Sequence, residues 1–486
     1  YHCLSSGINA EYMGTMESKM TAIFKHSLSS LFTPLLFLSF SHGLQNQTLS
    51  LRPLPAPPPR LSPDLPWIVS DAEPAPDAAL ALRLEPIDSL LASFNSTPER
   101  LFNLRLRRDA RRVKHLSART LRRSGFSTPV VSGLPLGMGE YITRLGIGTP
   151  PTNNYLVLDT GSDITWVQCR RCMSCYPQVD PIFDPEHSRT FRRLTCSSPL
   201  CRSLPRPGCN YASRTCVYKV QYGDGSFTVG DLAAETLSFD GAKRIPGLPL
   251  GCGHNNRGLF VGSAGLLGLG RGPLSFPSFT ARLYGGRFSY CLVERTAASK
   301  SSALQFGGPA PSPSTRFTPL LTDPLYPSFY FVGLTGFTVG GEMVRGIRRS
   351  ASRGNGGAGV ILDSGTSVTR LSGRAYAALR DAFRVGAADL GERVVPGGVS
   401  LFDTCYDLAG MERVAVPTVA MWFGDVEVAL PARNYLIPVD DRATHCFAFA
   451  PTDQSVSIIG NIQQQGVRVV YDLAGSRVGF EPGACD

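Results

Sequence analysis

The sequence predicts a mainly β protein built from two related halves. Its 486 residues include 50 Gly and 38 Pro, which divide the chain into short apolar segments rich in Val, Leu, Phe and Tyr. Short segments of this composition, bounded by turn residues, are typical of strands rather than helices. With 43% hydrophobic residues, the chain is long enough to form two or three domains with ordinary cores.

A weak internal repeat is the reason to expect two halves. An apolar segment ending in YLVLDTGS (Tyr155–Ser162) is echoed by VILDSGTS (Val360–Ser367). Each is followed further along the chain by two apolar residues and a Gly, at Leu266–Gly268 and Ile458–Gly460. The same parts in the same order predict two units related by an approximate two-fold axis, and we expect the two Asp-Thr/Ser-Gly loops to meet at that axis.

Individual elements follow from local pattern. Alternating or continuous apolar runs predict strands in six segments: 139–150, 155–158, 216–222, 230–239, 329–339 and 466–471. One helix is expected after Ser372, which can cap a run that carries Tyr376, Leu379 and Phe383 on one face.

The N-terminal part resembles a processed leader. Residues 16–43 are predicted to be a signal peptide, because Lys19 and Lys25 precede the apolar run Leu31–Phe40 and small or polar residues follow it. The alternative is an organelle transit peptide, since the segment is rich in Ser, although it lacks Arg. Residues 44–128 are expected to form a pro-segment with a Pro-rich spacer. No later run of about 18 apolar residues occurs, so no membrane span is predicted.

The formal net charge of +10 is concentrated in one stretch. Arg100–Arg123 contains ten basic residues and one acidic residue, whereas residues 129–486 have a net charge of +5. Basic amphipathic helices can bind membranes or nucleic acid. Because this stretch lies just before the first predicted strand, we favour a removable helix of the pro-segment, acting as an intramolecular inhibitor, and expect no nucleic-acid partner.

Cysteine usage favours an oxidising compartment. Apart from Cys3, twelve Cys lie between Cys169 and Cys485, and seven of them fall within residues 169–216. A CxxCxxC run can hold zinc or an iron–sulfur cluster, but a secretory leader favours six disulfides. Seven is an odd number, so one bridge must leave the cluster, and Cys252 is the nearest candidate. The other two pairs are predicted to be Cys405–Cys446 and Cys291–Cys485.

The two Asp residues of the repeat, Asp159 and Asp363, can carry out hydrolysis. Two carboxylates held close together do not both ionise easily, so they share a proton, and one acts as a base while the other acts as an acid. A water between them can lose a proton to one carboxylate and attack a peptide carbonyl, while the other protonates the developing oxyanion. The flanking residues have matching roles in turning the backbone and donating hydrogen bonds: Thr160, Gly161, Ser162, Ser364, Gly365 and Thr366.

These motifs resemble those of the pepsin-like aspartic proteases. The matching segments are DTGSDITW (Asp159–Trp166), YGDGSFTVG (Tyr222–Gly230), ILDSGTS (Ile361–Ser367) and the two apolar-apolar-Gly elements. The Cys-rich insert beginning with CYPQVDPIFDPEHSRTF (Cys175–Phe191) is similar to that of the plant nepenthesin-like branch. The resemblance covers 139–485. One departure is Ser364, where many members have Thr, and the hydroxyl is kept.

The resemblance implies a bilobal β fold, with two pseudo-two-fold-related lobes, few short helices and a substrate cleft between the lobes. It implies lobes at 129–327 and 328–486. Asp159 and Asp363 would be catalytic, with Thr160, Gly161, Ser162, Ser364 and Gly365 in supporting roles. Substrate would contact Tyr222 and Gly225 of a flap hairpin, as well as Trp166 and Thr366. Tyr222 would be hydrogen-bonded to Trp166.

The expected protein is therefore a monomeric aspartic endopeptidase that acts on polypeptides without cofactor or metal and reaches the cell wall or extracellular space, with the vacuole as an alternative. The rival hypothesis is a non-catalytic binding protein on the same fold, such as a glycosidase inhibitor. Other protease classes lack support, because no HExxH or GxSxG occurs and only His187, His254 and His445 follow the pro-segment. We also expect the precursor to be inert near neutral pH and to mature in acid by cleavage between Arg123 and Val131.

Overall fold

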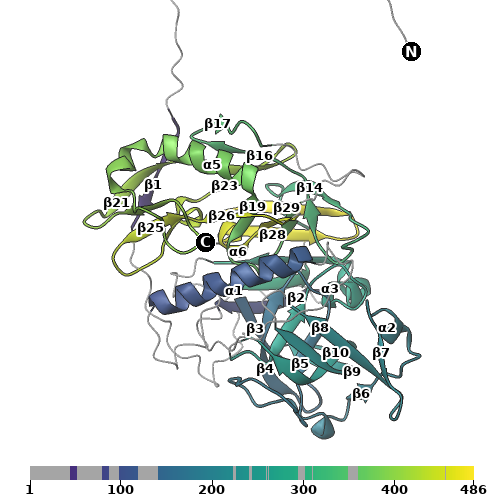
Figure 1. The fold of residues 1–486 in the computed structure, drawn as a ribbon. Coiled ribbons are helices and arrows are strands. Elements are labelled where there is room, and N and C mark those ends of the chain that lie inside the picture. The colour runs from purple at the N-terminus through teal and green to yellow at the C-terminus, as the bar shows by residue number, and fades with distance from the viewer. Residues whose placement is uncertain are drawn as a thin grey trace, which may run out of the picture. The chain divides into compact units, whose positions relative to one another are not determined.

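The computed structural model describes residues 44–51, 79–86, 98–118, 141–222, 226–239, 243–258, 260, 262–293, 302–308, 310–347, 360–454 and 456–485. These residues belong to one compact unit. Strands dominate, with a few short helices, which confirms the predicted mainly β fold (Figure 1). Three of the predictions concern residues that lie outside the described ranges: the signal peptide, the cleavage in acid between Arg123 and Val131, and the substrate contact of Gly225.

The first lobe is formed largely by strands between residues 141 and 268. Its longest hairpin joins β9 and β10, and β3 and β4 form another antiparallel pair. The strands are β3 (Tyr141–Ile147), β4 (Thr152–Asp159), β5 (Thr165–Gln168), β6 (Arg192–Arg193), β7 (Gly208–Asn210), β8 (Thr215–Gln221), β9 (Phe227–Phe239), β10 (Lys243–Arg257) and β11 (Gly265–Gly268). Short helical turns lie at η2 (Pro185–His187) and α2 (Pro199–Arg202).

The second lobe contains three sets of paired strands. The first set surrounds the second Asp loop and consists of β15, β18, β19, β26 and β27. The second is a four-stranded sheet with the order β17-β16-β22-β23, and the third is a three-stranded sheet with the order β20-β25-β24. The strands are β15 (Phe331–Val332), β16 (Leu334–Val339), β17 (Glu342–Met343), β18 (Val360–Leu362), β19 (Thr369–Ser372), β20 (Cys405–Asp407), β21 (Arg413–Pro417), β22 (Val419–Phe423), β23 (Val426–Leu430), β24 (Leu436–Pro438), β25 (Thr444–Phe447), β26 (Phe449–Thr452) and β27 (Ser457–Ile459). Its short helices are η3 (Ala388–Arg393), η4 (Ala432–Asn434) and α6 (Asn461–Gln464).

The internal repeat appears in space as two equivalent strand pairings. In the first lobe β11 runs parallel to β4, and in the second β27 runs parallel to β18. Each of these partner strands also pairs antiparallel with the strand that follows the Asp loop, β5 or β19. The two apolar-apolar-Gly elements therefore lie directly beside the strands that end in the Asp loops.

A six-stranded antiparallel sheet connects the lobes. Its order is β2-β13-β12-β28-β29-β14, so it combines strands from three separate parts of the chain. The members are β2 (Ala79–Pro86), β12 (Arg287–Cys291), β13 (Ser302–Gly307), β14 (Arg316–Leu321), β28 (Val467–Asp472) and β29 (Arg477–Pro482). Two short helices, α3 (Phe276–Phe279) and α4 (Ala281–Tyr284), precede β12.

Two strands of the expected pro-segment were not predicted from the sequence. Besides β2 in the connecting sheet, β1 (Asn46–Ser50) pairs antiparallel with β21 of the second lobe. Leu49 and the even-numbered leucines of β2 are buried in the main core. The part of the chain before the first lobe thus contributes strands to both the connecting sheet and the second lobe.

Helix α1 (Pro98–Ala118) contains most of the basic stretch and confirms that this segment is helical (blue in Figure 1). Pro at its first position and Glu99 in its first turn are typical of a helix start. Phe102, Leu106 and Val113 lie on one face and are buried against residues of the second lobe, with the Phe102 ring 6.3 Å from that of Phe402. Burial of this apolar face stabilises α1 despite its high charge.

The expected helix after Ser372 is α5 (Gly373–Gly386), and Tyr376, Leu379 and Phe383 are its buried residues as predicted. Ser372 occupies the N-cap position, but its side chain makes no capping hydrogen bond, so that detail of the prediction is wrong. The backbone N–H of Ser372 instead donates to the Ser457 hydroxyl, which ties the helix start to β27.

All twelve cysteines between Cys169 and Cys485 form disulfides, as predicted. The bridges are Cys169–Cys252, Cys172–Cys175, Cys196–Cys209, Cys201–Cys216, Cys291–Cys485 and Cys405–Cys446. The two pairs predicted by name, Cys405–Cys446 and Cys291–Cys485, are among them, and Cys252 is the partner of the bridge that leaves the cluster. The CxxCxxC run therefore has its sulfurs in disulfide bonds rather than in a metal site.

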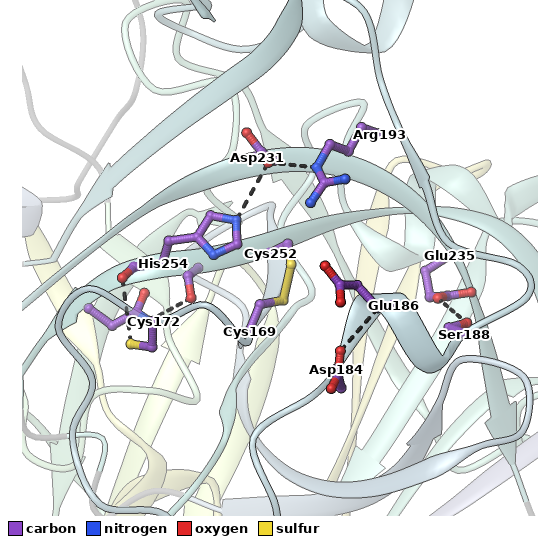
Figure 2. The surroundings of a disulfide bond; sticks show 12 residues. Cys169, Cys172, Asp184, Glu186, Ser188, Arg193, Asp231, Glu235, Cys252 and His254 are labelled. Atoms are coloured by element: carbon purple, nitrogen blue, oxygen red, sulfur yellow. Dashed lines mark hydrogen bonds and ion pairs between the residues drawn. A yellow bond between two sulfur atoms is a disulfide. The ribbon is translucent and has the colours of Figure 1, made fainter. Parts of the chain in front are cut away.

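Figure 2 shows the bridge that leaves the cysteine cluster, Cys169–Cys252, with Asp231 near it. Arg193 donates to Asp231 at 2.9 Å, and His254 lies 3.5 Å from the same carboxylate oxygen. The hydrogen bond from His254 and the nearby Arg193 lower the pKa of Asp231. Residues 169–193 are thus held to β9 and β10 by an ion pair as well as by a disulfide.

Among the described residues, no helix is both long and apolar enough to cross a membrane.

The disulfide of the second lobe should contribute strongly to stability. Cys405 and Cys446 are fully buried partners on adjacent strands, 41 residues apart in sequence. Chain entropy predicts that Cys405→Ala with Cys446→Ala lowers the free energy of unfolding by about 4 kcal/mol, against about 2 kcal/mol for Cys172→Ala with Cys175→Ala. Urea denaturation of both double variants checks this, and equal losses would contradict it.

Candidate active site

The two Asp loops meet in the structure. Asp159 is the last residue of β4 and Asp363 directly follows β18, and both side chains are buried. The backbone N–H of Gly161 donates to Oδ1 of Asp159 at 3.0 Å, and that of Gly365 donates to Oδ1 of Asp363 at 3.1 Å. Each carboxylate is therefore oriented by its own loop in the same way.

Reciprocal hydrogen bonds hold the loops to each other. The Thr160 hydroxyl accepts from the Ser364 N–H at 2.9 Å and donates to the Leu362 carbonyl at 3.3 Å. In turn, the Ser364 hydroxyl accepts from the Thr160 N–H at 3.2 Å and donates to the Leu158 carbonyl at 3.4 Å. Four buried hydrogen bonds across the symmetry axis thus fix the relative position of the two carboxylates. Ser364 makes the same pattern of contacts as Thr160, so the methyl group that a Thr would carry at position 364 is not needed for these hydrogen bonds.

The outer carboxylate oxygens also have matching partners. Ser162 donates to Oδ2 of Asp159 and Thr366 donates to Oδ2 of Asp363, both at 2.5 Å. These short hydrogen bonds leave the Oδ1 atoms as the pair facing the centre of the site.

Glycine is required on both loops because the space beside the carboxylates is small. A Cβ atom on Gly161 would lie 3.0 Å from Oδ1 of Asp363, and one on Gly365 would lie 2.9 Å from Oδ1 of Asp159. Any larger residue would push the opposite carboxylate away. The Gly of each motif therefore serves close approach of the loops as well as the turn.

Arg112 of α1 binds both carboxylates. Its Nη2 donates to Oδ1 of Asp159 at 2.5 Å and to Oδ1 of Asp363 at 2.9 Å, while its Nε donates to Oδ2 of Asp363 at 2.8 Å. The Nε also lies 3.1 Å from the Thr366 hydroxyl. A single guanidinium nitrogen is in contact with the inner oxygens of both loops, so the two carboxylates face one small shared space.

One turn earlier on the same helix, Asp109 is fully buried against the second lobe. It accepts from the backbone N–H of Ser367 and from that of Val368 at 3.1 Å, and Arg370 donates to it at 2.8 Å. Burial raises the pKa of Asp109, and the attraction of Arg370 opposes this rise. Helix α1 thus makes charged contacts of both signs next to the second Asp loop.

Trp166 and Tyr222 lie together beside the first loop. The Trp166 indole N–H donates to the Tyr222 hydroxyl at 2.6 Å, which is the hydrogen bond that the resemblance implies. Both rings pack edge-on against Phe260, with centroids 5.0 Å and 5.4 Å from it. Burial and the nearby Asp159 raise the pKa of Tyr222 well above its ordinary value, so its hydroxyl stays protonated.

Several residues near the site were not singled out from the sequence. Asn461 donates from its side chain to the Ser364 carbonyl at 2.9 Å and from its backbone to the Thr366 carbonyl at 2.7 Å, so it supports the second loop. Arg112 was predicted only as one of ten basic residues. Asp109 had a visible signal, since it is the one acidic residue of that stretch. Arg370 had none, because its partner comes from a distant segment.

In the part of the chain that the structure describes, His, Cys, Asp and Glu side chains form no group of three or more suited to hold a metal ion.

Comparisons with known proteins agree with this geometry. Models of "Xylanase inhibitor N-terminal" and "Xylanase inhibitor C-terminal" match residues 141–308 and 329–482. "Aspartyl protease family protein 2" of Arabidopsis thaliana is 56% identical over 423 residues, which cover 84% of this chain and 86% of the relative. "Aspartic proteinase nepenthesin-1" of Nepenthes gracilis is 38% identical over 413 residues, covering 83% of this chain and 90% of the relative.

Similarity to solved structures bears on the fold alone. The structure described as "Crystal structure of edgp" has a TM-score of 0.59 and 20% sequence identity, and the match covers 83% of this chain and 95% of that chain. The structure of the basic 7S globulin from soybean gives a TM-score of 0.55 at 21% identity, covering 71% and 93% of the two chains.

The paired Asp loops and these relatives together define the class: the chain belongs to the pepsin-like aspartic proteases and is an aspartic-type endopeptidase. Within that family it belongs to the plant nepenthesin-like aspartyl proteases, as the resemblance of its motifs predicted.

The hydrogen bonds between the loops should be needed for both folding and activity. Thr160→Val keeps the side-chain volume but removes the hydroxyl that accepts from the Ser364 N–H, leaving that buried donor unpaired. We expect the free energy of unfolding to fall by about 1–3 kcal/mol and kcat to fall more than KM rises, because the carboxylates lose their relative position.

Denaturation and steady-state kinetics on a peptide substrate measure both effects. Thr195→Val is the matched control, because Thr195 is exposed, and the free energy of unfolding of this variant should change by less than about 0.5 kcal/mol. A Thr160→Val enzyme with unchanged kcat would contradict the role of the hydrogen bonds between the loops.

Proposed function

We propose that the chain is the inactive precursor of a secreted aspartic endopeptidase, which hydrolyses peptide bonds with a water activated between Asp159 and Asp363. The observation that carries the proposal is the shared space between the inner oxygens of the two carboxylates, where one nitrogen of Arg112 contacts both. A group of that size and polarity is what a nucleophilic water would replace once Arg112 has left.

The mechanism follows from the coupling of the two carboxylates. Close together and without a cation between them, they hold one proton as a unit, so one is a base and the other an acid. The base takes a proton from the water as its oxygen attacks the substrate carbonyl, and the acid protonates the carbonyl oxygen. The carboxyl that took the proton from water then gives it to the amide nitrogen, the C–N bond breaks, and the other carboxylate takes a proton from a hydroxyl of the intermediate, which restores the dyad. Ser162 and Thr366 keep the outer oxygens hydrogen-bonded throughout.

Tyr222, Trp166 and Gly225 are proposed to contact the substrate from the first lobe. The Trp166–Tyr222 hydrogen bond and their packing on Phe260 support a fixed position for the base of the flap. Thr366 is proposed to contact substrate from the second lobe, since its hydroxyl is already 3.1 Å from the Arg112 Nε that occupies the site in the precursor.

The rival hypothesis is a binding protein without catalysis, and the family models carry the name of xylanase inhibitors. Such a protein needs the fold but not the dyad. The complete set of carboxylates, loop hydroxyls and glycines in this chain favours the peptidase, since an inhibitor surface gives no reason for two buried carboxylates to face each other.

Residues 44–128 are proposed to be the inhibitory pro-segment, preceded by the signal at 16–43 and followed by lobes at 129–327 and 328–486. The support comes from α1, whose Arg112 neutralises the dyad and occupies the position of the nucleophile. Its side chain is 12% exposed, so solvent screens these ion pairs little. No substrate could reach the dyad while α1 is docked.

Acid maturation is proposed to act through the dyad. Protonating either carboxylate removes part of the charge that attracts Arg112, so low pH weakens these ion pairs. Asp109 acts in the opposite direction. Its pKa is raised in the docked state, so it binds a proton more tightly there than in a free segment, and acid favours docking at this one position. The acid sensitivity of the precursor should therefore depend on Arg112 and not on Asp109.

The six disulfides are what an oxidising compartment produces, and they support a route through the secretory pathway. The cell wall or extracellular space is the proposed destination, with the vacuole as the alternative, and the enzyme is proposed to act on polypeptides as a monomer.

Loss of either catalytic carboxylate should abolish proteolysis while the protein still folds. Asp159→Asn and Asp363→Asn change volume little but prevent the sharing of a proton, and we expect kcat to fall by at least about 1,000-fold. Cleavage of a denatured protein at acid pH is the assay. Asp407→Asn, an exposed residue of β20, is the matched control and should keep full activity. Substantial turnover by either dyad variant would overturn the assignment.

Removing the Arg112 charge should weaken inhibition. We expect the Arg112→Gln precursor to cleave a quenched peptide near neutral pH before any processing, with activity at least about tenfold above that of the wild-type precursor, because a buried ion pair is lost. N-terminal sequencing alongside the assay shows whether the active species is still full length.

The control is Arg107→Gln, an exposed position on the same helix, which should leave the precursor inert. If the Arg112→Gln precursor is as inert as the wild type, the inhibitory role is wrong even though the peptidase assignment stands.

A further inference from the structure

The surface that α1 covers contains a second charged site beside the dyad. Three groups of the second lobe converge on the carboxylate of Asp109: the N–H of Ser367, the N–H of Val368 and the guanidinium of Arg370. Two backbone donors and one cation aimed at a single carboxylate form an anion-binding arrangement.

This arrangement is buried and depends on Asp109. The side chains of Asp109 and Arg370 are 1% and 5% exposed. The Nε of Arg370 has no hydrogen-bond partner, although it too is buried. Among the described residues, Asp109 is the one carboxylate that forms an ion pair with Arg370. Arg370 is also fixed by its backbone, because β19 pairs with both β26 and β27 at this residue.

Removal of the pro-segment takes Asp109 away but leaves its three partners in the mature enzyme. A cation left without a counter-charge in a largely buried position is unfavourable, and the two N–H groups lose their acceptor as well. The site is then prepared for another carboxylate of the same size.

The position of this site relative to the dyad limits what can occupy it. Ser367 directly follows Thr366, which donates to Asp363, so the anion site adjoins the second Asp loop. Asp109 also lies three residues before Arg112, which is about 5 Å along a helix axis. An extended peptide advances about 3.3 Å per residue. A side chain within about three residues of the scissile bond can therefore reach the site.

We propose that Arg370, with the N–H groups of Ser367 and Val368, forms a subsite in the mature enzyme that selects an Asp or Glu side chain of the substrate within about three residues of the scissile bond. This inference rests on the proposed function, because it requires α1 to leave and peptides to take its place. Asp109 occupies the subsite in the precursor as a substrate side chain does in the mature enzyme.

The test uses mature enzyme from acid-activated precursor and sets of quenched peptides. In each set, every position within three residues of the scissile bond carries Glu, Gln, Leu or Lys in turn. The assay is run near pH 5, where a Glu side chain is mostly ionised. We expect kcat/KM for Glu to exceed that for Gln by about tenfold at one position, because a charged hydrogen-bonded partner is replaced by a neutral one.

Variants locate the effect. Arg370→Met should reduce the Glu/Gln ratio at that position to about one, and Arg370→Lys should keep part of it. Arg380→Met is the control for loss of a positive charge on the same lobe, since Arg380 pairs with Asp381 and Asp403 on the surface, and it should keep the wild-type ratio. Asp109→Asn should leave mature specificity unchanged, because residue 109 is removed, while weakening the docking of α1.

Each outcome has a distinct meaning. If no peptide is cleaved, the proposed function itself fails. If peptides are cleaved but the wild-type enzyme shows no preference for Glu over Gln at any position, the subsite is wrong and the peptidase stands. The wild-type ratio decides this even where Arg370→Met does not fold. A preference that persists in Arg370→Met also overturns the proposal.

Discussion

The structure depends on holding two carboxylates in one small space. Like charges held close together repel, and the reciprocal hydrogen bonds of Thr160 and Ser364 fix the loops against this repulsion from both sides. The glycines after each Asp follow from the same constraint, since a Cβ there would displace the opposite carboxylate. The parallel pairing of each Asp strand with an apolar-apolar-Gly strand then anchors both loops in the cores of their lobes.

That constraint also explains why α1 places a cation between the two carboxylates. Two carboxylates buried this close together need a partner of opposite charge when they are ionised, and Arg112 contacts both with three hydrogen bonds from one planar group. A neutral side chain could block the site by size alone, but it would leave the charge of the carboxylates unpaired. Helix α1 therefore packs against the second lobe as well as covering the paired carboxylates, and β1 and β2 extend the contacts of this part of the chain to the sheets.

Sequence reasoning succeeded where the determinants are local or repeated. The Asp loops, the helix α5 and the disulfide Cys405–Cys446 follow from motif, period and spacing, and the structure contains all three elements. Strand β1 was missed because a five-residue polar segment has little strand signal of its own, and its partner lies far away in the chain. Strand β2 does carry a signal, the alternating Leu80, Leu82 and Leu84, but the assignment of its segment to a removable leader led us to overlook it. The Asp109–Arg370 pair was missed because its two residues are 261 positions apart.

The charges of α1 affect where along the second lobe this helix docks, as well as how tightly it binds there. Asp109 lies on the same face as the buried Phe102, Leu106 and Val113, where an apolar residue would pack at lower cost. Buried ion pairs contribute little net stability, but they can discriminate between alternative arrangements. If α1 slid by one turn, Arg112 would approach Arg370, or Asp109 would approach the dyad, and either encounter brings like charges together. The opposite charges of Asp109 and Arg112, one turn apart, are thus compatible with a single docking position, the one in which the guanidinium lies between the carboxylates of Asp159 and Asp363.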